Sequence, residues 1–449
     1  MNTHAAVSIA RAAVARVNPV AIVRSRLALN GSQLTVQTSS EPLVIDLAAY
    51  RRVVVLGAGK AGAAMAQGLE AVLGDRLSEG LVVTKYGHGL PLHTVELLEA
   101  GHPVPDDNSL AAGRAIASRA RALTEEDLCI TLVSGGGSAL LTLPAEFPAA
   151  AVSLADVQAT TELLLGAGAP IQDVNCLRRH LSGIAGGRFI ELAAPARVLA
   201  LVLSDVVGDQ LESIASGLVA PDPTTYQDAE AVCHRYGIHD RLPPGVANLV
   251  AAGIAGDVPD TPGPEASVFR TVDSVVIGSN RGALEAAAEE ARSRGYNTVV
   301  LTSQLTGEAR EIAKLFSAMA ADIARDAGPV SRPACILAGG ETTVTLRGNG
   351  LGGRNQEMAL GVLAEIAPRP TAYRGMTFLS VGTDGSDGPT DAAGGFAAPE
   401  YAGEVDAVPR IADALARNDA YHLLDELGAL YRSGPTNTNV CDIQILLVD

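Results

Sequence analysis

A lysine stands inside a glycine-rich turn near the start of the chain, where its ammonium group could neutralise an anionic ligand. The turn belongs to VVVLGAGKAGAAMAQGLE, which begins at Val53, and the lysine is Lys60. The turn follows the G-x-G-x-x-G spacing at Gly57, Gly59 and Gly62. A hydrophobic strand that enters such a turn predicts a helix from about Lys60 to Leu73. The N-terminus of a helix offers free N–H groups and the positive end of its dipole, so we expect an anion site here.

The same spacing is typical of dinucleotide-binding turns, in which an acidic residue about 20 residues further on holds the ribose hydroxyls. The next strand-like segment, GLVVTKYG, supplies Lys85 instead of an acid. This disfavours NAD and leaves NADP open, because Lys85 could meet a 2′-phosphate. A Walker A loop is excluded, because it requires Ser or Thr after its lysine and Lys60 is followed by alanine.

A second glycine turn follows the strand-like segment EDLCITLVS. Its residues are Ser134, Gly135, Gly136, Gly137 and Ser138. Three consecutive glycines let backbone N–H groups form a nest around a phosphate group. The alternative is a tight turn with helix-capping serines. The turn does not match the G-x-S-x-G pattern of a nucleophile elbow.

Carboxylates follow two further strand-like segments and could orient a hydroxyl group or hold Mg²⁺. Asp205 comes directly after RVLALVLS, and VGTDGSDGPTDAAGG contains Asp384, Asp387 and Asp391. A helix cap or turn at Asp205 and simple Asp-Gly turns in the second segment are the alternatives. Asp205 and Asp384 are the candidate metal ligands.

Two arginine positions complete the candidate site. Arg354 follows a glycine pair in LRGNGLGGRNQEMAL, at the start of a predicted helix. A cation at a helix N-terminus opposes the helix dipole, which makes most sense if an anion lies between them; a surface arginine is the alternative. Arg178 and Arg179, in DVNCLRRHLSGIAGGRF, form a further basic cluster in an acidic chain.

Strand-like and helix-like segments alternate along the chain, which indicates an α/β protein. The first half has a doubly wound pattern, with ligands expected beyond the carboxyl ends of its strands. The Pro/Gly-rich stretch that begins at Gly256 predicts a domain boundary, with one domain at 1–258 and a smaller α/β domain at 259–449. After this stretch we expect the alternation to restart at VDSVVIGS. PACILAGGETTVTL predicts two strands joined by a Gly-Gly turn, and TNVCDIQILLVD a final strand.

The composition restricts the function. The formal net charge of −17 argues against a nucleic-acid-binding surface, which needs a basic field. No uncharged apolar run reaches the ~18 residues of a membrane-spanning helix. The five cysteines are scattered without a C-x-x-C pair, which indicates a reducing compartment, and we take the cytoplasm as the location. The opening segment MNTHAAVSIARAAVARVNPVAIVRSRL bears arginines and no acids, as transit peptides do, but an amphipathic helix of the folded protein is the favoured interpretation.

Taken in order, the motifs resemble those of the glycerate 2-kinases that carry a MOFRL domain at the C-terminus. The landmarks are GAGKAG, EAGHPVPD, SGGGSALL, RRHLSGIAGGR, SDVVGD with IASGLVAPDPTT, LAGGETTV with GGRNQE, and GTDGSDGPTDAAG. The resemblance covers nearly the whole chain. One departure is Leu218, which follows Ser216 and Gly217 where the family usually has proline.

The resemblance implies a large Rossmann-like N-terminal domain, a smaller α/β domain and an active site in the cleft between them. It implies transfer of the γ-phosphoryl group of ATP to the 2-hydroxyl of D-glycerate with Mg²⁺, and it places the family's proposed catalytic pair on Lys60 and Arg354. Some members are labelled hydroxypyruvate reductases, so an NADP-dependent reductase is the alternative function. A non-catalytic anion-binding protein is a third. The general base, the exact metal ligands and the oligomeric state stay open.

Overall fold

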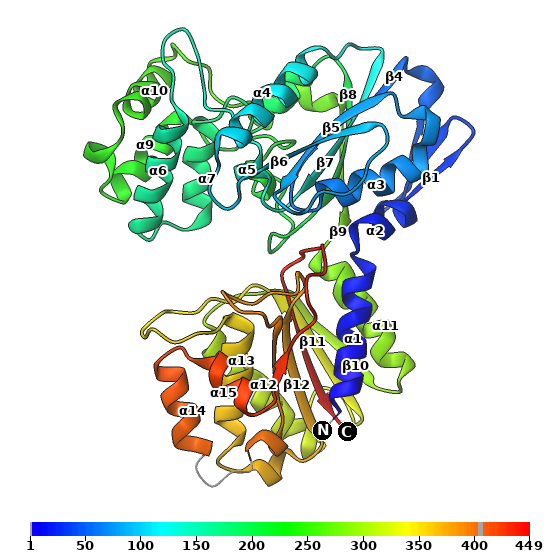
Figure 1. Ribbon diagram of the computed structural model, residues 1–449, viewed down its shortest axis with the longest axis vertical. Helices are drawn as coiled ribbons and strands as arrows, with labels where there is room; N and C mark the ends of the chain where they lie inside the picture. The colour runs from blue at the N-terminus through cyan, green and yellow to red at the C-terminus, as the bar shows by residue number, and fades with distance from the viewer. Residues whose placement is uncertain (1, 403–406) are drawn as a thin grey trace. The chain divides into compact units, whose positions relative to one another are not determined.

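The computed structural model describes residues 2–402 and 407–449 and divides into two compact units. We call Ile22–Ile277 the parallel-sheet unit. The mixed-sheet unit consists of Met1–Ala21 and Gly278–Asp449. Figure 1 shows a sheet with helices packed on it in each unit, which confirms the α/β class.

The parallel-sheet unit is built on a six-stranded sheet in the order β6-β5-β4-β7-β8-β9. The strands β4 to β8 pair in parallel. Every residue of β7 is buried, as expected for a strand that helices cover on both faces. The strands are β4 Arg52–Ala58, β5 Glu79–Lys85, β6 Val95–Ala100, β7 Asp127–Ser134, β8 Arg197–Leu203 and β9 Val272–Gly278. A small antiparallel sheet consists of β1 Leu27–Asn30, β2 Gln33–Val36 and β3 Leu43–Asp46.

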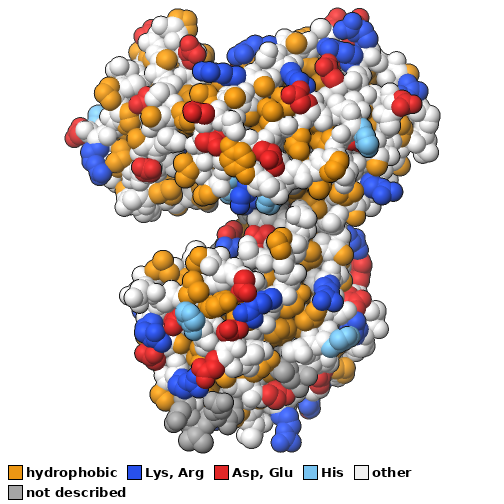
Figure 2. Space-filling view, viewed as in Figure 1, with side chains coloured by type: hydrophobic (Ala, Val, Ile, Leu, Met, Phe, Trp, Pro, Cys, Tyr) orange, Lys and Arg blue, Asp and Glu red, His pale blue; other side chains and the backbone are white. Residues whose placement is uncertain are grey.

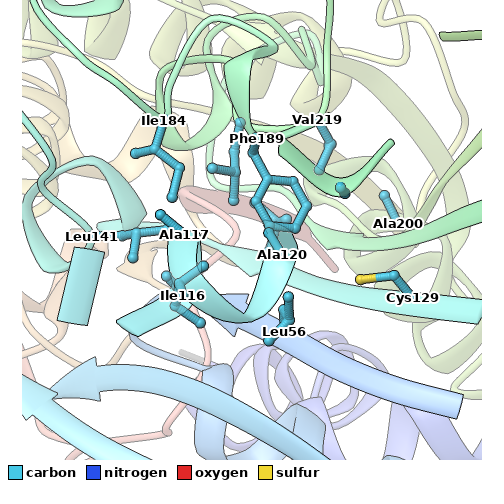
Figure 3. Close-up of a cluster of buried hydrophobic side chains, with 14 of the residues drawn as sticks. Leu56, Ile116, Ala117, Ala120, Cys129, Leu141, Ile184, Phe189, Ala200 and Val219 are labelled. Atoms are coloured by element: carbon cyan, nitrogen blue, oxygen red, sulfur yellow. The ribbon is translucent and has the colours of Figure 1, made fainter. Parts of the chain in front are cut away.

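Small residues allow the helices of this unit to lie close to the sheet. Helix α3 starts at Gly62, where a Cβ atom would lie 3.2 Å from the carbonyl oxygen of Val83. On the face covered by α4 and α8, the ring of Phe189 lies among Ile116 and Ala120, as Figure 3 shows. The helices are α2 Pro19–Arg26, α3 Gly62–Leu73, α4 Asp107–Arg121, α5 Gly137–Leu140, α6 Leu154–Gly166, α7 Ile171–His180, α8 Arg188–Ala193, α9 Tyr226–Arg235 and α10 Pro244–Ala255.

The mixed-sheet unit has six strands in the order β10-β11-β15-β12-β13-β14. Among the strands described in this unit, β10 and β11 pair in parallel and the other neighbours pair antiparallel. The strands are β10 Asn297–Leu305, β11 Ala334–Gly340, β12 Met376–Gly382, β13 Gly394–Ala397, β14 Leu430–Tyr431 and β15 Asp442–Val448. The helices are α1 Thr3–Arg16, α11 Asn280–Ser293, α12 Ala309–Ala324, α13 Arg354–Ile366, α14 Ala407–Ala416 and α15 Ala420–Glu426.

The opening segment of the chain is an α-helix that packs in the mixed-sheet unit. Figure 1 shows α1 beside α11, and the side chains of Ala6 and Ile9 are fully buried there. The phenol of Tyr296 joins the two ends of the chain, because it accepts from the Asn2 amide (2.7 Å) and donates to the Asp449 carboxylate (2.8 Å). Among the described residues, no single helix is long and apolar enough to cross a membrane. Helices α1 and α2 pass that test only when they are taken together, across a bend of 59°.

The unit limits differ from the predicted division at 258 and 259. Strand β9, in the segment expected to start a new alternation, is the last strand of the first sheet. Helix α1, which was predicted to belong to the first domain, is part of the mixed-sheet unit, because its apolar face packs on α11. The predicted pair of strands in PACILAGGETTVTL is wrong: β11 ends at Gly340, whose φ of 145° turns the chain away from the sheet. The final predicted strand is confirmed as β15.

Candidate active site

The two glycine turns lie side by side at the carboxyl ends of β4 and β7. The chain runs from β4 outward to β5 and β6, and then returns to β7 on the other side of β4. The order of the strands therefore reverses between β4 and β7, and such switch points are where open α/β sheets bind ligands. Lys60 follows β4, and Ser134 ends β7. The tertiary structure thus brings the two predicted turns together.

The backbone amides of the first turn, from Gly59 to Gly62, are bonded within the protein, so the anion site predicted at the start of α3 stays a prediction for the amides that follow. The three amides between β4 and α3, and that of Gly62 at the start of α3, each donate to an acceptor of the protein. Gly59 donates to the Val83 carbonyl oxygen (3.1 Å), Lys60 to that of Gly135 (2.8 Å), Ala61 to the hydroxyl of Ser134 (3.1 Å) and Gly62 to the carbonyl of Gly59 (2.9 Å). The first turn therefore contributes its lysine side chain to the site, and its amides hold the second turn in place.

The second turn keeps its amides available. Within the described part of the chain, no hydrogen-bond acceptor is found for the N–H groups of Gly135, Gly136, Gly137 and Ser138. Gly136 has a left-handed backbone with φ 83°, and α5 begins at the next residue. Successive amides around a left-handed residue point to one side and form an anion-binding nest. The nest expected from the sequence therefore has its donors free at the second turn.

Three side chains surround this nest: Lys60, His102 and Asp205. A Cβ atom at Gly135 would lie 1.7 Å from Oδ2 of Asp205. At Gly136 it would lie 2.8 Å from Cδ2 of His102 and 3.2 Å from Cε of Lys60. The two glycines are thus needed because these side chains occupy the space that a Cβ would take.

The charged groups next to the nest, Lys60 and Asp205, have opposite signs and are both half-buried. Burial raises the pKa of Asp205, and the nearby charge of Lys60 opposes that rise. Burial, followed by the positive charge of Lys60, lowers the pKa of His102 to about 4, with Lys85 acting in the same direction. His102 is therefore neutral at pH 7, where its imidazole can donate or accept a hydrogen bond without adding charge. The predicted contact of Lys85 with a bound phosphate stays a prediction.

The loop that carries His102 is held in place by Asp106, the N-cap of α4. The Asp106 carboxylate accepts from the backbone of Ser109 (2.9 Å) and Gly101 (3.2 Å) and from the phenol of Tyr86 (2.6 Å). These bonds lower the pKa of Asp106 to about 2, although burial acts in the opposite direction. His102 was not among the predicted site residues. The only signal was the motif EAGHPVPD, which gives no hint of which strand end the loop reaches.

A serine pair joins the second turn to a strained segment after β8. The hydroxyls of Ser138 and Ser216 are 2.7 Å apart, and the Ser216 hydroxyl is 3.4 Å from Oδ1 of Asn175. Ala215 and Ser216 have positive φ angles of 49° and 54°, and such strain in non-glycine residues is common at functional sites. Neither Ala215 nor Ser216 was among the site residues predicted from the sequence.

Of the two neighbouring arginines in α7, Arg178 is the one available to a ligand. It lies one helical turn after Asn175, on the same face of α7. Burial lowers its pKa, and no acceptor for its guanidinium is found among the described residues. Arg179 instead forms a buried ion pair with Asp222 (2.9 Å).

Arg354, in the mixed-sheet unit, is paired with the protein's own carboxylates. Its Nε lies 2.5 Å from Oδ2 of Asp442 and its second edge 2.8 Å from Glu341. Burial lowers the pKa of Arg354, but the bonds and charge of Asp442 outweigh it and raise the pKa above its ordinary value. The side chain is still 35% exposed, so part of the guanidinium remains accessible.

A carboxylate also occupies the start of α13, where an external anion was expected. The carboxylate of Asp387 accepts from the backbone amides of Asn355 (3.1 Å) and Gln356 (2.8 Å). Burial raises the pKa of Asp387 to about 6 against these bonds. Asp384, the other predicted metal ligand, is half-buried and accepts from the amide of Ser386 (2.9 Å). Asp205 and Asp384 belong to different units, so the structure describes each in its own surroundings.

Charges of both signs share the surface of each unit. Figure 2 shows acidic and basic side chains interspersed over the visible face, although the net charge is −17. Attraction of an anionic ligand therefore depends on a local arrangement such as the one around Lys60. In the described part of the chain, the five cysteines are buried and none of them forms a disulfide.

Comparison with known proteins identifies relatives over most of the chain. Residues 5–251 match a family described as a domain of unknown function, DUF4147, and residues 334–442 match the MOFRL family. The chain is 40% identical to a D-glycerate 2-kinase of Thermotoga maritima, over 88% of this chain and 91% of that protein. It is 41% identical to a protein of Agrobacterium vitis, provisionally named a hydroxypyruvate reductase, over 88% of this chain and 99% of that protein.

The solved structures agree with this relationship. The fold matches the crystal structure of a glycerate kinase from Thermotoga maritima with a TM-score of 0.84 and 36% identity, covering 99% of both chains. A Pyrococcus horikoshii protein matches with the same TM-score at 34% identity, over 99% of this chain and 98% of that one. By its two family matches, its sequence identity and its fold, the chain belongs to the glycerate 2-kinase family of MOFRL-containing phosphotransferases.

Proposed function

We propose that this chain transfers the γ-phosphoryl group of ATP to the 2-hydroxyl of D-glycerate, producing 2-phosphoglycerate in an Mg²⁺-dependent reaction. Membership of the glycerate 2-kinase family supports the substrate. The observation that carries the proposal is the group of free amides at Gly135–Ser138 beside Lys60, His102 and Asp205, at the switch point of the sheet.

Each group at the nest has a role in this proposal. Phosphoryl transfer requires mainly positioning and charge stabilisation from the protein. The amides of the second turn hold phosphoryl oxygens, and the ammonium of Lys60 offsets their charge. An ion pair at 4 Å contributes ~4 kcal/mol at an effective dielectric of ~20, against ~1 kcal/mol in water, so partial burial strengthens the interaction. Neutral His102 adds a hydrogen bond to the bound anion.

The residues around the nest also fit Mg²⁺, which prefers oxygen ligands. Asp205 provides a half-buried carboxylate beside the free amides, with the hydroxyls of Ser134 and Ser138 on the same turn. We propose that Asp205 holds the ion, and Asp384 stays a second candidate ligand. When bound, Mg²⁺ neutralises charge on the β- and γ-phosphate oxygens.

We include Arg354 in the proposal as the second catalytic cation. Its two ion pairs hold the guanidinium in one orientation, and its exposed part can contact a substrate carboxylate or phosphate. Because Lys60 and Arg354 belong to different units, their joint action is itself part of what must be tested.

The NADP-dependent reductase is the weaker alternative. Dinucleotide-binding turns offer their amides to the pyrophosphate. Here the amides of Gly59, Lys60 and Ala61 are bonded to the protein, so the G-x-G-x-x-G spacing serves the internal packing of two turns.

The experiment is a substrate test with matched lysine variants. We expect D-glycerate and ATP to yield ADP and 2-phosphoglycerate, identified by NMR of the product. Lys60→Ala should lower kcat about 100-fold or more, a loss of ~3 kcal/mol of transition-state stabilisation, and Lys60→Arg should not restore it.

Lys314→Ala is the control, because Lys314 is an exposed lysine of α12 that pairs with Glu311. Turnover of NADPH with hydroxypyruvate, without consumption of ATP, would refute the proposed reaction. Exclusive formation of 3-phosphoglycerate would refute its regiochemistry, and an unchanged kcat in Lys60→Ala would remove the lysine from the mechanism.

A further inference from the structure

Three metal-ligating side chains converge at the carboxyl end of α9, in the parallel-sheet unit. Glu230 and His234 are four residues apart and lie on one face of the helix, and His239 lies in the short 3-10 helix His239–Arg241 that follows. One ligand atom from each of the three lies within 4.8 Å of the other two. The cluster lies on α9 and the turn after it, and α9 packs on α7 and α10, away from the glycine turns at the strand ends.

The backbone between the two histidines has a defined conformation. Gly237 ends α9 with a left-handed φ of 61°, and its amide donates to the carbonyl of His234 (3.1 Å). The next amide, that of Ile238, donates back to the carbonyl of Cys233 (3.0 Å). This pair of bonds is a Schellman motif, in which the residue after the glycine packs against the last turn of the helix. Both Ile238 and Cys233 are fully buried in one hydrophobic cluster, so His239 is anchored directly beside His234.

The imidazole rings of His234 and His239 lie against each other, and a carboxylate lies beside one of them. The imidazoles of His234 and His239 stack, with centroids 4.1 Å apart and an interplanar angle of 13°. The Nδ1 atom of His239 is 3.2 Å from Oδ1 of Asp240. When Nδ1 donates its proton to this carboxylate, Nε2 keeps its lone pair for a metal, which is how metal-binding histidines are commonly oriented. The carboxyl end of a helix also carries the negative end of its dipole, which favours a cation.

We propose that Glu230, His234 and His239 bind one divalent transition-metal ion, with Zn²⁺ as the reference ion. Two imidazole nitrogens and one carboxylate form a three-ligand set that suits Zn²⁺ and leaves a position for water, whereas Mg²⁺ prefers oxygen ligands. Metal–ligand bonds of ~2.0–2.2 Å in tetrahedral geometry place two donors on the same ion ~3.4 Å apart. The donor atoms, which lie within 4.8 Å of one another, must therefore approach by up to ~1.4 Å and one stacked ring must rotate, and the half-buried or exposed positions of the side chains permit this.

The bound ion would cross-link α9 to the turn that follows it. Helix α9 packs on α7, which carries Arg178, so the ion stabilises the helices around one predicted site residue without contacting the glycine turns. The expected consequence is a rise in the melting temperature with Zn²⁺, since an ion that binds only the folded chain stabilises it.

The test is Zn²⁺ binding to the full-length protein after chelator treatment, measured by competition with a chromogenic chelator in excess Mg²⁺. We expect one Zn²⁺ per chain and an upward shift in melting temperature. His234→Ala and His239→Ala should each raise the Kd for Zn²⁺ at least about tenfold, and Asp240→Ala, which removes the acceptor for Nδ1 of His239, should raise it about tenfold. His93→Ala is the matched control, because His93 is an exposed histidine outside the cluster.

Circular dichroism of each variant checks that the chain is folded, and the absorption spectrum of bound Co²⁺ gives a second readout of imidazole ligation. Loss of the Co²⁺ bands in His239→Ala with an unchanged circular dichroism spectrum would support the site. Absence of Zn²⁺ binding by the wild type would overturn the proposal, as would equal affinity in the wild type and both histidine variants. Full displacement of Zn²⁺ by Mg²⁺ would also overturn it.

Discussion

Gly135→Ala is the substitution that tests the geometry of the nest most directly. The backbone of Gly135 is outside the left-handed region, so alanine is permitted there by conformation. The obstacle is Asp205, because the new Cβ would lie 1.7 Å from its Oδ2 and 2.3 Å from its Cγ. Since real Cβ atoms essentially never approach a heavy atom within 3.0 Å, the carboxylate oxygen must retreat by at least ~1.3 Å, the difference between the two distances.

The expected loss of catalytic rate follows from this displacement of the Asp205 carboxylate. Misplacing a catalytic group by about 1 Å can cost about 100-fold in rate, so we expect kcat/KM for D-glycerate to fall at least about 100-fold. The Mg²⁺ concentration for half-maximal activity should rise as well, because Asp205 is the proposed Mg²⁺ ligand. The free energy of unfolding should fall by only about 1–3 kcal/mol, the usual cost of one extra methyl group in a packed site.

The assay is steady-state kinetics over a range of Mg²⁺ concentrations, with urea unfolding alongside. Gly166→Ala is the neutral control, because a Cβ at the end of α6 meets no atom within 4 Å. Gly57→Ala is the control for stability, since its Cβ would lie 2.4 Å from the backbone oxygen of Leu132, which cannot rotate away.

A double-mutant cycle decides whether the effect acts through the carboxylate. If Gly135→Ala works by displacing Asp205, it should cost nothing further in an Asp205→Ala background. Wild-type kinetics and an unchanged Mg²⁺ requirement in Gly135→Ala would refute the reasoning. Full additivity with Asp205→Ala would show that the damage lies in the backbone of the turn.

Three further outcomes follow from the structure. Arg354→Ala should lower kcat strongly with little change in nucleotide Kd. It should also lower the free energy of unfolding by about 3–5 kcal/mol, because it removes the partner of the buried Asp442. In an Asp442→Asn background, urea unfolding should show a smaller stability loss for Arg354→Ala, and steady-state kinetics should show the same loss of kcat. For Asp387, the pKa is raised from 3.8 to about 6, so the folded state holds this proton more tightly than the unfolded chain. The contribution of this proton to the free energy of unfolding is fully present below pH 3.8 and is lost as the pH rises through 6. Asp387→Asn removes this titration, so the free energy of unfolding of the variant should rise by about 3 kcal/mol relative to that of the wild type between pH 3.8 and 6. A difference between the two proteins that stays constant over this pH range would contradict the assignment. His102→Phe removes the imidazole near the nest and should lower kcat/KM at every pH from 5 to 8. The reason is that the wild-type imidazole, with a pKa of about 4, is neutral throughout that range. A loss of kcat/KM confined to one end of this pH range would show that the imidazole titrates there.

Local sequence determined the parts of the site that a single strand–turn–helix unit can specify. The buried β-branched run before Gly57 predicts a central parallel strand, and the three glycines after Ser134 predict a turn with open amides. The position of Arg354 at the start of α13 could also be read from its preceding glycine pair. These features depend on neighbours within a few residues, and the periodicities of strands and helices carry them.

Tertiary structure alone decided which of these features meet and which are already satisfied. The hydroxyl of Ser134 takes the amide of Ala61, 73 residues away, so the first turn loses its free donors. Asp442, 88 residues after Arg354, supplies the anion that a ligand was expected to supply. His102 reaches the nest because its loop follows β6 in a sheet whose order reverses between β4 and β7. Pairing of this kind depends on strand order and on the packing of distant segments, which no local pattern of residues records.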